Sequence, residues 1–128
     1  MQVLSSRVLY GASDFETLRR FYEVTLGLEP YREYGVGGQV SGVVFFLGGG
    51  FLEVHRAETS SPTITLWLQV PDAAGEERRL RDAGVEITRP VERMPWGLIE
   101  AWFRDPAGNE LRLVEVPEDH PIRRRVGD

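Results

Sequence analysis

The sequence predicts an α+β domain made of two tandem βαβββ modules, which together form a curved mixed sheet with a cup-shaped cavity on one face and helices on the other. The main observation is an internal repeat. Asp14 and Asp72 each follow a strand-like stretch and precede a helical pattern, and they lie 58 positions apart. The glycines that close the two helical patterns, Gly27 and Gly84, lie 57 positions apart. A repeated unit that cannot bury its own apolar face usually packs on its copy.

The repeat sets the expected boundaries. We place module one at about 3–57 and module two at about 62–116, within one domain that covers 1–118. The remaining residues, 117–128, contain few apolar side chains and are expected to form an exposed tail.

The first helix is predicted from its cap and its apolar stripe. Ser13 and Glu16 have the spacing of a capping box, in which the hydroxyl and the carboxylate each accept a backbone N–H. Apolar residues then recur at spacings of three and four, at Phe15, Leu18, Tyr22 and Leu26. The glycine that follows suits the left-handed position just past a helix end.

The second helix has a similar but less apolar pattern. Asp72 is its expected N-cap, and Glu77 and Arg81 are spaced as an i,i+4 ion pair. Leu80 and Ala83 are expected to face inward.

Alternating apolar residues and turn residues predict one strand before each helix and three after it. The six later strands lie near 31–36, 40–47, 51–56, 85–90, 97–104 and 110–116. The glycines at 48–50 connect two strands in the first module, and the loop Asp105–Asn109 connects two in the second.

The composition narrows the choice of partners. The 128-residue chain has no cysteine, which excludes disulfides, thiolate nucleophiles and cysteine metal ligands. All of its basic residues are arginines, and its net charge of −5 argues against nucleic acid as a partner. The basic run Arg123–Arg125 is interpreted as part of a solvated tail.

No apolar run is long enough to cross a bilayer, and the N-terminus is unlike a signal peptide. We therefore expect no membrane association and a cytoplasmic location.

Two stretches of the chain resemble the vicinal-oxygen-chelate superfamily, which contains glyoxalases, bleomycin resistance proteins and extradiol dioxygenases. They are SDFETLRRFYEVTLGLEP, with its FY…LGL signature, and PWGLIEAWFRDPAGNELRLVE, with its PWG and DPxGN elements. Neither element is specific alone, but both occur in the family's order inside the 58-residue repeat. The runner-up fold is a ferredoxin-like α+β domain.

The resemblance implies one divalent metal in the cup, bound by His, Gln or Glu on the first and last strands of each module. The matching positions in this sequence are Arg7, Glu53, Thr65 and Arg112. Arginine has no lone pair to give a cation, and one carboxylate does not hold a catalytic metal. We therefore expect no metal and no other cofactor. A displaced site is the alternative, in which His55 joins Glu53 and a neighbour such as Glu100 or Glu110.

Strand alternation predicts which residues line the cup. It places Arg7, Glu53, Thr65 and Arg112 on the same faces as Phe51, His55 and Trp67, and it gives the helices an apolar set. Aligning the two hairpins adds Phe45 and Trp102 to the cup. The expected ligand-binding residues are Arg7, Phe45, Phe51, Glu53, His55, Trp67, Trp102 and Arg112.

Aromatic walls with a few converging charges suit a small molecule. The leading hypothesis is a metal-free protein, similar to the bleomycin resistance branch, that binds a small aromatic and anionic ligand. A metal-dependent lyase, isomerase or dioxygenase with shifted ligands is the main alternative. A third hypothesis is a metal-free enzyme with Glu53 or His55 as general base, and a fourth is an interaction module. Exposed sheet edges and the family resemblance also predict a homodimer.

Overall fold

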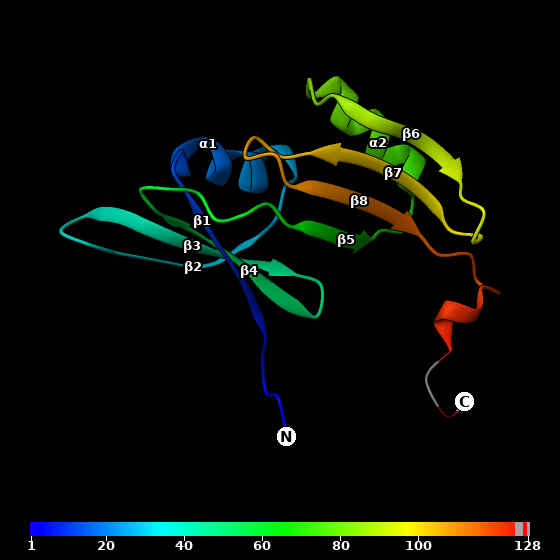
Figure 1. Cartoon of the computed structure of the whole chain (residues 1–128), viewed down its shortest axis with the longest axis horizontal. Helices are drawn as coiled ribbons and strands as arrows, with labels where there is room; N and C mark the ends of the chain where they lie inside the picture. Colours follow the sequence, from blue (N-terminus) through cyan, green and yellow to red (C-terminus); the bar gives the residue numbers. More distant parts are fainter. Residues whose placement is uncertain (125–126, 128) are drawn as a thin grey trace. The chain divides into compact units, whose positions relative to one another are not determined.

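The computed structural model describes residues 1–124 and 127, and the chain divides into two compact units between Pro62 and Thr63. Each unit has one helix and one four-stranded mixed sheet (Figure 1). The units correspond to the two predicted modules. The predicted α+β class and the βαβββ order of each module are therefore confirmed. Arg125, the last residue of the basic run, lies outside the described residues.

Module one contains β1 (Arg7–Ala12), α1 (Phe15–Arg20), a π-helical turn (Phe21–Thr25), β2 (Pro30–Val36), β3 (Gln39–Leu47) and β4 (Gly50–Arg56). Its strands lie in the order β1-β4-β3-β2. The β1–β4 pair is parallel and the two other pairs are antiparallel. The last strand of the module therefore lies in the middle of the sheet, beside the first.

The start of α1 differs from the predicted capping box. Asp14 is the N-cap, and its side chain accepts the N–H of Thr17 at 3.3 Å. Ser13 instead donates its own N–H to Ser60 Oγ at 2.9 Å, and Glu16 pairs with Arg56 at 2.6 Å. Ser13 and Glu16 therefore bond to residues far away in the sequence and not to each other's backbone N–H groups. The predicted capping box was wrong, although the helix begins where predicted.

Module two contains β5 (Thr65–Gln69), α2 (Ala73–Asp82), β6 (Ile87–Arg93), β7 (Ile99–Arg104) and β8 (Glu110–Glu115). Its strand order, β5-β8-β7-β6, repeats that of module one. A short 3-10 turn, Pro121–Arg123, follows in the tail.

The predictions for α2 are confirmed at its cap and its ion pair. Asp72 accepts the N–H of Gly75 at 3.0 Å, and Glu77 pairs with Arg81 at 3.3 Å. Leu80 is fully buried as predicted. Ala83 is exposed because the helix ends one residue earlier, so its predicted inward position was wrong.

The core of each module lies between its sheet and its helix. In module one, α1 packs against β1 and β4, and in module two α2 packs against β6, β7 and β8. The residues predicted to face the helices are buried at Tyr10, Leu52, Val54, Leu66, Leu111 and Leu113. Two predicted residues are exceptions, because Val8, near the start of β1, is 40% exposed and Leu68 is only half-buried. The sheet register predicted by alternation is therefore confirmed for these four strands.

The hairpins that lead into β4 and β8 have turns of different length. In module one Leu47 pairs with Gly50, so only Gly48 and Gly49 lie between the strands. In module two Arg104 pairs with Glu110, and residues 105–109 form the loop. Asp105 fixes that loop, since its Oδ1 accepts the N–H of Asn109 at 2.9 Å.

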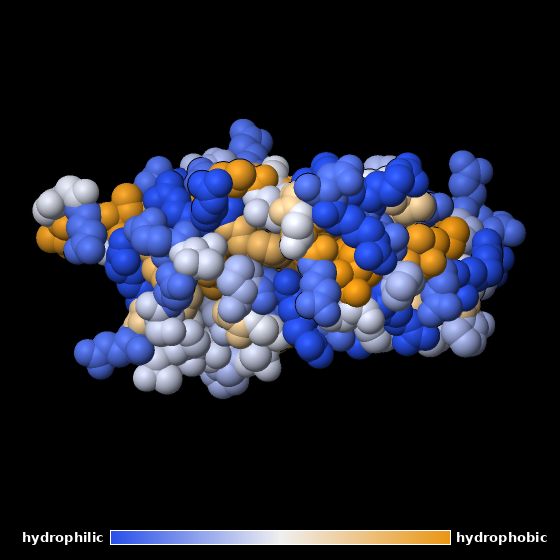
Figure 2. Space-filling view, turned by 90° about the horizontal axis from the view of Figure 1, so that it is seen from above, coloured by the Kyte–Doolittle hydropathy of each residue, from blue (hydrophilic) through white to orange (hydrophobic). Residues whose placement is uncertain are grey.

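Seen from the side drawn in Figure 2, hydrophilic residues dominate and hydrophobic ones form separate small patches. Among the residues that the structure describes, no helix combines the length and apolar character needed to cross a bilayer.

Candidate functional site

The candidate functional surface of each module is its open face, meaning the face of the sheet opposite to the helix. Residues paired across neighbouring strands point to the same side, so the register divides each open face into rows. In module one, Leu9 pairs with Glu53, and Glu53 pairs with Val44. In module two, the equivalent row contains Trp67, Arg112, Trp102 and Arg89. Glu53 and Arg112 thus occupy equivalent central positions.

Glu53, on β4, accepts hydrogen bonds from side chains of β1 and β2 in module one. Arg7 donates to Glu53 Oε1 at 2.8 Å, and the hydroxyl of Tyr34 donates to Oε2 at 2.7 Å. His55 Nδ1 lies 3.5 Å from the same Oε2. This nitrogen is buried and forms no hydrogen bond. The predicted common face of Glu53 and His55 is confirmed, whereas Tyr34 was not predicted to take part.

Two glycines make room for the side chains that converge on Glu53. Gly42 pairs with Tyr34, and a Cβ at this position would lie 2.3 Å from the tyrosine ring. Gly11 pairs with His55, and a Cβ there would lie 3.0 Å from His55 Nε2. Tyr34 and His55 can therefore lie over the neighbouring strands, with their polar atoms directed to Glu53.

The electrostatics of this cluster follow from the same contacts. Burial by itself would raise the pKa of Glu53, but the hydrogen bonds from Tyr34 and Arg7 and the charge of Arg7 outweigh burial and lower it below the ordinary value of 4.5. Burial, followed by the bond to Glu53, raises the pKa of Tyr34 from 10.0 to about 12. At neutral pH the cluster is a carboxylate held by a guanidinium and a neutral phenol.

The open face of module two has an arginine at its centre. The guanidinium carbon of Arg112 lies 3.9 Å from the ring centroid of Trp102, and that of Arg89 lies 4.9 Å from it. The two arginines come from the strands on either side of β7. The cation–π contacts therefore support Trp102 from both neighbouring strands. Trp67, at the end of the same row, is 47% exposed.

Both arginines of this row are also paired with acids. Glu110 Oε2 accepts from Arg112 Nε and Nη2, both at 2.9 Å. Glu92 accepts from Arg89 Nε at 2.8 Å. Within module two, the carboxylate of Glu110 thus bonds one edge of the Arg112 guanidinium, and the indole of Trp102 packs against that guanidinium.

A buried carboxylate lies beside this row, at Glu100. It is only 2% exposed, and its two oxygens accept the indole N–H groups of Trp96, at 2.7 Å, and Trp102, at 2.8 Å. Sequence reasoning did not include Glu100 or Trp96 among the binding residues. The signal was present, because Glu100 and Trp102 are two positions apart on one strand and share a face.

One predicted site residue faces the wrong way. Phe45 pairs with Leu52, is fully buried and packs against Tyr22 with ring centroids 6.3 Å apart, so it belongs to the helix side. Phe46 takes its place on the open face. There its ring lies 5.5 Å from Phe51, and Tyr31 contacts both. The prediction aligned two hairpins whose turns differ by an odd number of residues, which inverts the alternation.

The residues at the family's metal positions do not fit a divalent ion. Arg7 and Arg112 offer only donors and carry positive charge, and Thr65 supplies at most a neutral oxygen. Glu53, the one normal ligand, is occupied by Arg7 and Tyr34. Across the described part of the chain, no three His, Asp or Glu side chains come together in a way that could hold a metal ion.

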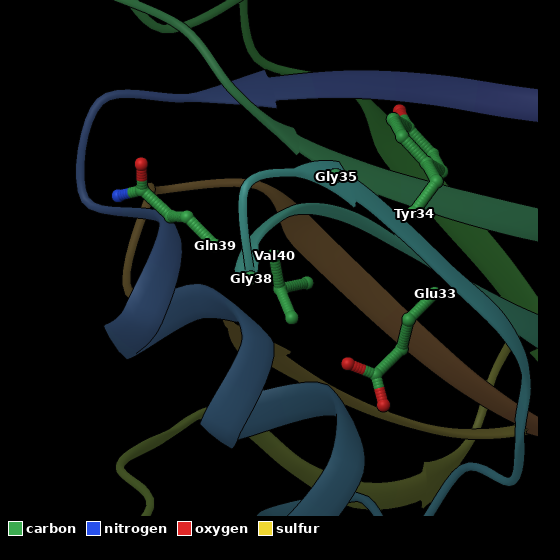
Figure 3. A pocket seen from close by; sticks show the side chains of 6 residues that line it. All are labelled: Glu33, Tyr34, Gly35, Gly38, Gln39 and Val40. Carbon is green, nitrogen blue, oxygen red and sulfur yellow. The ribbon is translucent and has the colours of Figure 1, made fainter.

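A recess of about 230 Å³ lies along the β2–β3 hairpin and is lined by Glu33, Tyr34, Gly35, Gly38, Gln39 and Val40. Figure 3 shows Glu33 and Tyr34 leaving β2 in opposite directions. Glu33 turns to the helix side and pairs with Arg19 of α1 at 3.3 Å. The recess is therefore shaped by the hairpin, and its acid is already paired.

The comparisons with known proteins decide the family. The model of the family described as "Glyoxalase/Bleomycin resistance protein/Dioxygenase superfamily" matches residues 5–113. The chain belongs to this superfamily. No curated protein matches it.

Several solved structures share this superfamily fold. TioX from Micromonospora sp. ML1 has a TM-score of 0.75 at 21% identity, over 87% of this chain and 97% of that one. A superfamily member from Sphaerobacter thermophilus has a TM-score of 0.71 at 28% identity, over 90% and 98%. The lactoylglutathione lyase of Agrobacterium tumefaciens has a TM-score of 0.67 at 21% identity, over 89% and 92%. At these identities TioX and the lyase indicate the fold and not a shared activity.

Proposed function

We propose that this superfamily member binds a small aromatic molecule, preferably an anionic one, and that it does so without a metal ion. The observation that carries the proposal is the row Trp67, Arg112, Trp102 and Arg89 on the open face of module two. A row of two indoles and two guanidinium groups across four strands offers flat surfaces to a planar ligand.

Trp67 is the residue most suited to stacking. Its side chain is 47% exposed, so the indole is accessible to a ligand. Trp102, by contrast, already has a guanidinium at 3.9 Å from its ring. We therefore assign the aromatic contact to Trp67 and a supporting role to Trp102.

Arg112 supports the preference for an anion. Its side chain is 35% exposed, and Glu110 accepts from its Nε and Nη2 only. A guanidinium has five N–H donors, so we expect the Nη1 edge to bind a carboxylate or similar group of the ligand. Module one adds Arg7, 36% exposed and bonded to Glu53. Phe51, Glu53 and His55 remain proposed ligand contacts of that module.

A fluorescence screen tests the proposal with aromatic acids, quinones and glycopeptide antibiotics. Trp67→Ala should weaken every aromatic hit by about 1–3 kcal/mol, because it loses both stacking and apolar burial. Arg112→Gln should weaken anionic hits alone, by about 1.5–3 kcal/mol. Val24→Ala, which removes an exposed apolar side chain in the π-helical turn of module one, is the control outside the row and should change binding little.

The outcomes separate the hypotheses. Equal binding by wild type and both row variants would place the site elsewhere and favour an interaction module. Equal losses for neutral and anionic hits in Arg112→Gln would show that Glu110 already neutralises the arginine.

The enzymatic alternatives receive less support. A lowered pKa makes the carboxylate of Glu53 a weak general base near neutral pH. The residues at the metal positions do not fit the ion that a lyase or dioxygenase of this superfamily would use. Binding is therefore the function that the geometry supports best.

We also propose that the protein acts as a homodimer in the cytoplasm. The edge strands of the sheets are β1 and β2 in module one and β5 and β6 in module two, and unpaired edges favour association. Light scattering should give twice the chain mass of 14.5 kDa. A concentration-independent monomer mass would contradict the dimer.

A further inference from the structure

Glu100 of module two is a buried acid, and both of its carboxylate oxygens have hydrogen-bond partners. Among the described residues, no arginine or histidine forms an ion pair with it. It is 2% exposed, and both of its oxygens accept from indole N–H groups. An indole N–H can only donate, so these two bonds suit a carboxylate that only accepts. Burying a charged group is costly unless it is hydrogen-bonded, which makes the two tryptophans necessary partners of Glu100.

The bond to Glu100 fixes the orientation of Trp102. The hydrogen bond of 2.8 Å holds the indole by its N–H edge, and Arg112 and Arg89 lie near its ring at 3.9 and 4.9 Å. A carboxylate that accepts from the N–H also makes the ring more electron-rich, and this strengthens its attraction for a guanidinium.

Glu110 alone does not determine the plane of Arg112. One carboxylate oxygen, Glu110 Oε2, accepts from both Nε and Nη2 at 2.9 Å. Two hydrogen bonds to a single oxygen atom fix one edge of the guanidinium, but the guanidinium plane can still tilt about that edge. The contact with Trp102 at 3.9 Å removes this freedom.

We propose that Glu100 is a positioning residue for ligand binding, which acts through Trp102 to hold the guanidinium plane of Arg112. This role in binding rests on the proposed function, in which Arg112 contacts the ligand. The chain of contacts itself, from Glu100 to Trp102 to Arg112, can be tested without any ligand.

The first test is the side-chain NMR resonance of Arg112 Nε–H, which the ring current of Trp102 shifts upfield. Glu100→Gln keeps the size of the side chain but retains only one acceptor oxygen. We expect the indole N–H resonances of Trp96 and Trp102 to move and the upfield shift of Arg112 to fall by about half or more. Glu76→Gln is the matched control, since it makes the same change in an acid of α2 that pairs with Arg79, outside this chain of contacts. It should leave Arg112 unchanged.

A double-mutant cycle separates positioning from general destabilisation. Trp102→Phe removes the N–H donor and keeps a ring, so it should shift Arg112 in the same direction as Glu100→Gln. If Glu100 acts through Trp102, the double variant should match Trp102→Phe alone. An unchanged Arg112 resonance in Glu100→Gln, or additive shifts in the double variant, would overturn the proposal.

The second test uses 2-naphthoate and its neutral amide as probes. Glu100→Gln should weaken 2-naphthoate by about 3- to 10-fold and the amide less, because only the acid uses Arg112. Equal losses for the two probes would contradict a role through Arg112. Failure of wild type to bind either probe would count against the proposed function, and the NMR result would still decide whether Glu100 positions Arg112.

Discussion

The two modules share a strand order and a register but have opposite charges at the centre of their open faces. Module one has Glu53, bound by Arg7 and Tyr34, and module two has Arg112 at the equivalent position, bound by Glu110 and Trp102. The scaffold is thus repeated while the chemistry is inverted. Each centre has protein partners of opposite or complementary chemistry within its own module.

The surroundings of the two centres also differ. Glu53 has a side chain only 12% exposed and three polar side chains around it, with two glycines that let them approach. Arg112 is 35% exposed and is flanked by indoles. Module one therefore resembles a closed polar cluster, and module two offers the surface that a ligand could reach.

The largest expected effect tests the difference between the two hairpins. Phe45→Ala should destabilise module one by about 3–5 kcal/mol, because it removes a fully buried ring. Phe46→Ala, one residue later, should cost about 1 kcal/mol, because Phe46 is 41% exposed on the open face. Urea unfolding of the two variants measures both. Similar losses would mean that the register of this hairpin is wrong.

A smaller effect is expected at the two centres. Glu53→Gln should lower the free energy of unfolding by about 1–2 kcal/mol at pH 7, since it weakens bonds to a largely buried carboxylate. Arg112→Gln should cost less than about 1 kcal/mol, because its ion pair is more exposed. The folded pKa of Glu53 is lowered, so the cost should disappear in acid, where the wild-type carboxylate is protonated as well. A loss that persists at low pH would show that the carboxylate charge is not its cause.

An effect confined to alkaline pH is expected at Tyr34. Its folded pKa is raised to about 12 from 10.0, so the folded state keeps the phenol proton longer than the unfolded chain does. The stabilisation from Tyr34 is therefore complete below pH 10 and is lost as the pH rises towards 12. Thermal melts of wild type should show this loss, and Tyr34→Phe should not. Gly42→Ala should also remove it, because its Cβ would displace the tyrosine ring.

Much of the fold could be predicted because it depends on local chemistry. Asp72 caps its helix with its own side chain, and Gly27 and Gly84 have the positive φ values that end a helix, 75° and 85°. Alternation also separated Tyr10 and Leu52 from the open face. The capping box of Ser13 failed because its partner, Ser60, is 47 residues away.

The residues of the candidate site were predictable only where the alternation within a single strand shows which face a side chain is on. Arg7, Glu53, Trp67 and Arg112 follow from alternation about the inferred ligand positions, and Trp102 followed from the hairpin comparison. Phe45 failed because turn length decides the register of a hairpin. Tyr34 was missed because a register shift between Tyr34 and Gly35 interrupts the strand pattern. Glu100 was named only as a possible metal neighbour, although its spacing from Trp102 places both side chains on one face of β7.

Internal ion pairs occupy two of the places where the superfamily holds a metal, with Arg7 bound to Glu53 and Arg112 bound to Glu110. Elemental analysis of protein expressed with added zinc, manganese, iron and nickel tests it, together with melts in chelator. We expect no stoichiometric metal and the same melting temperature with and without chelator. One tightly bound equivalent that disappears in Glu53→Ala would contradict it.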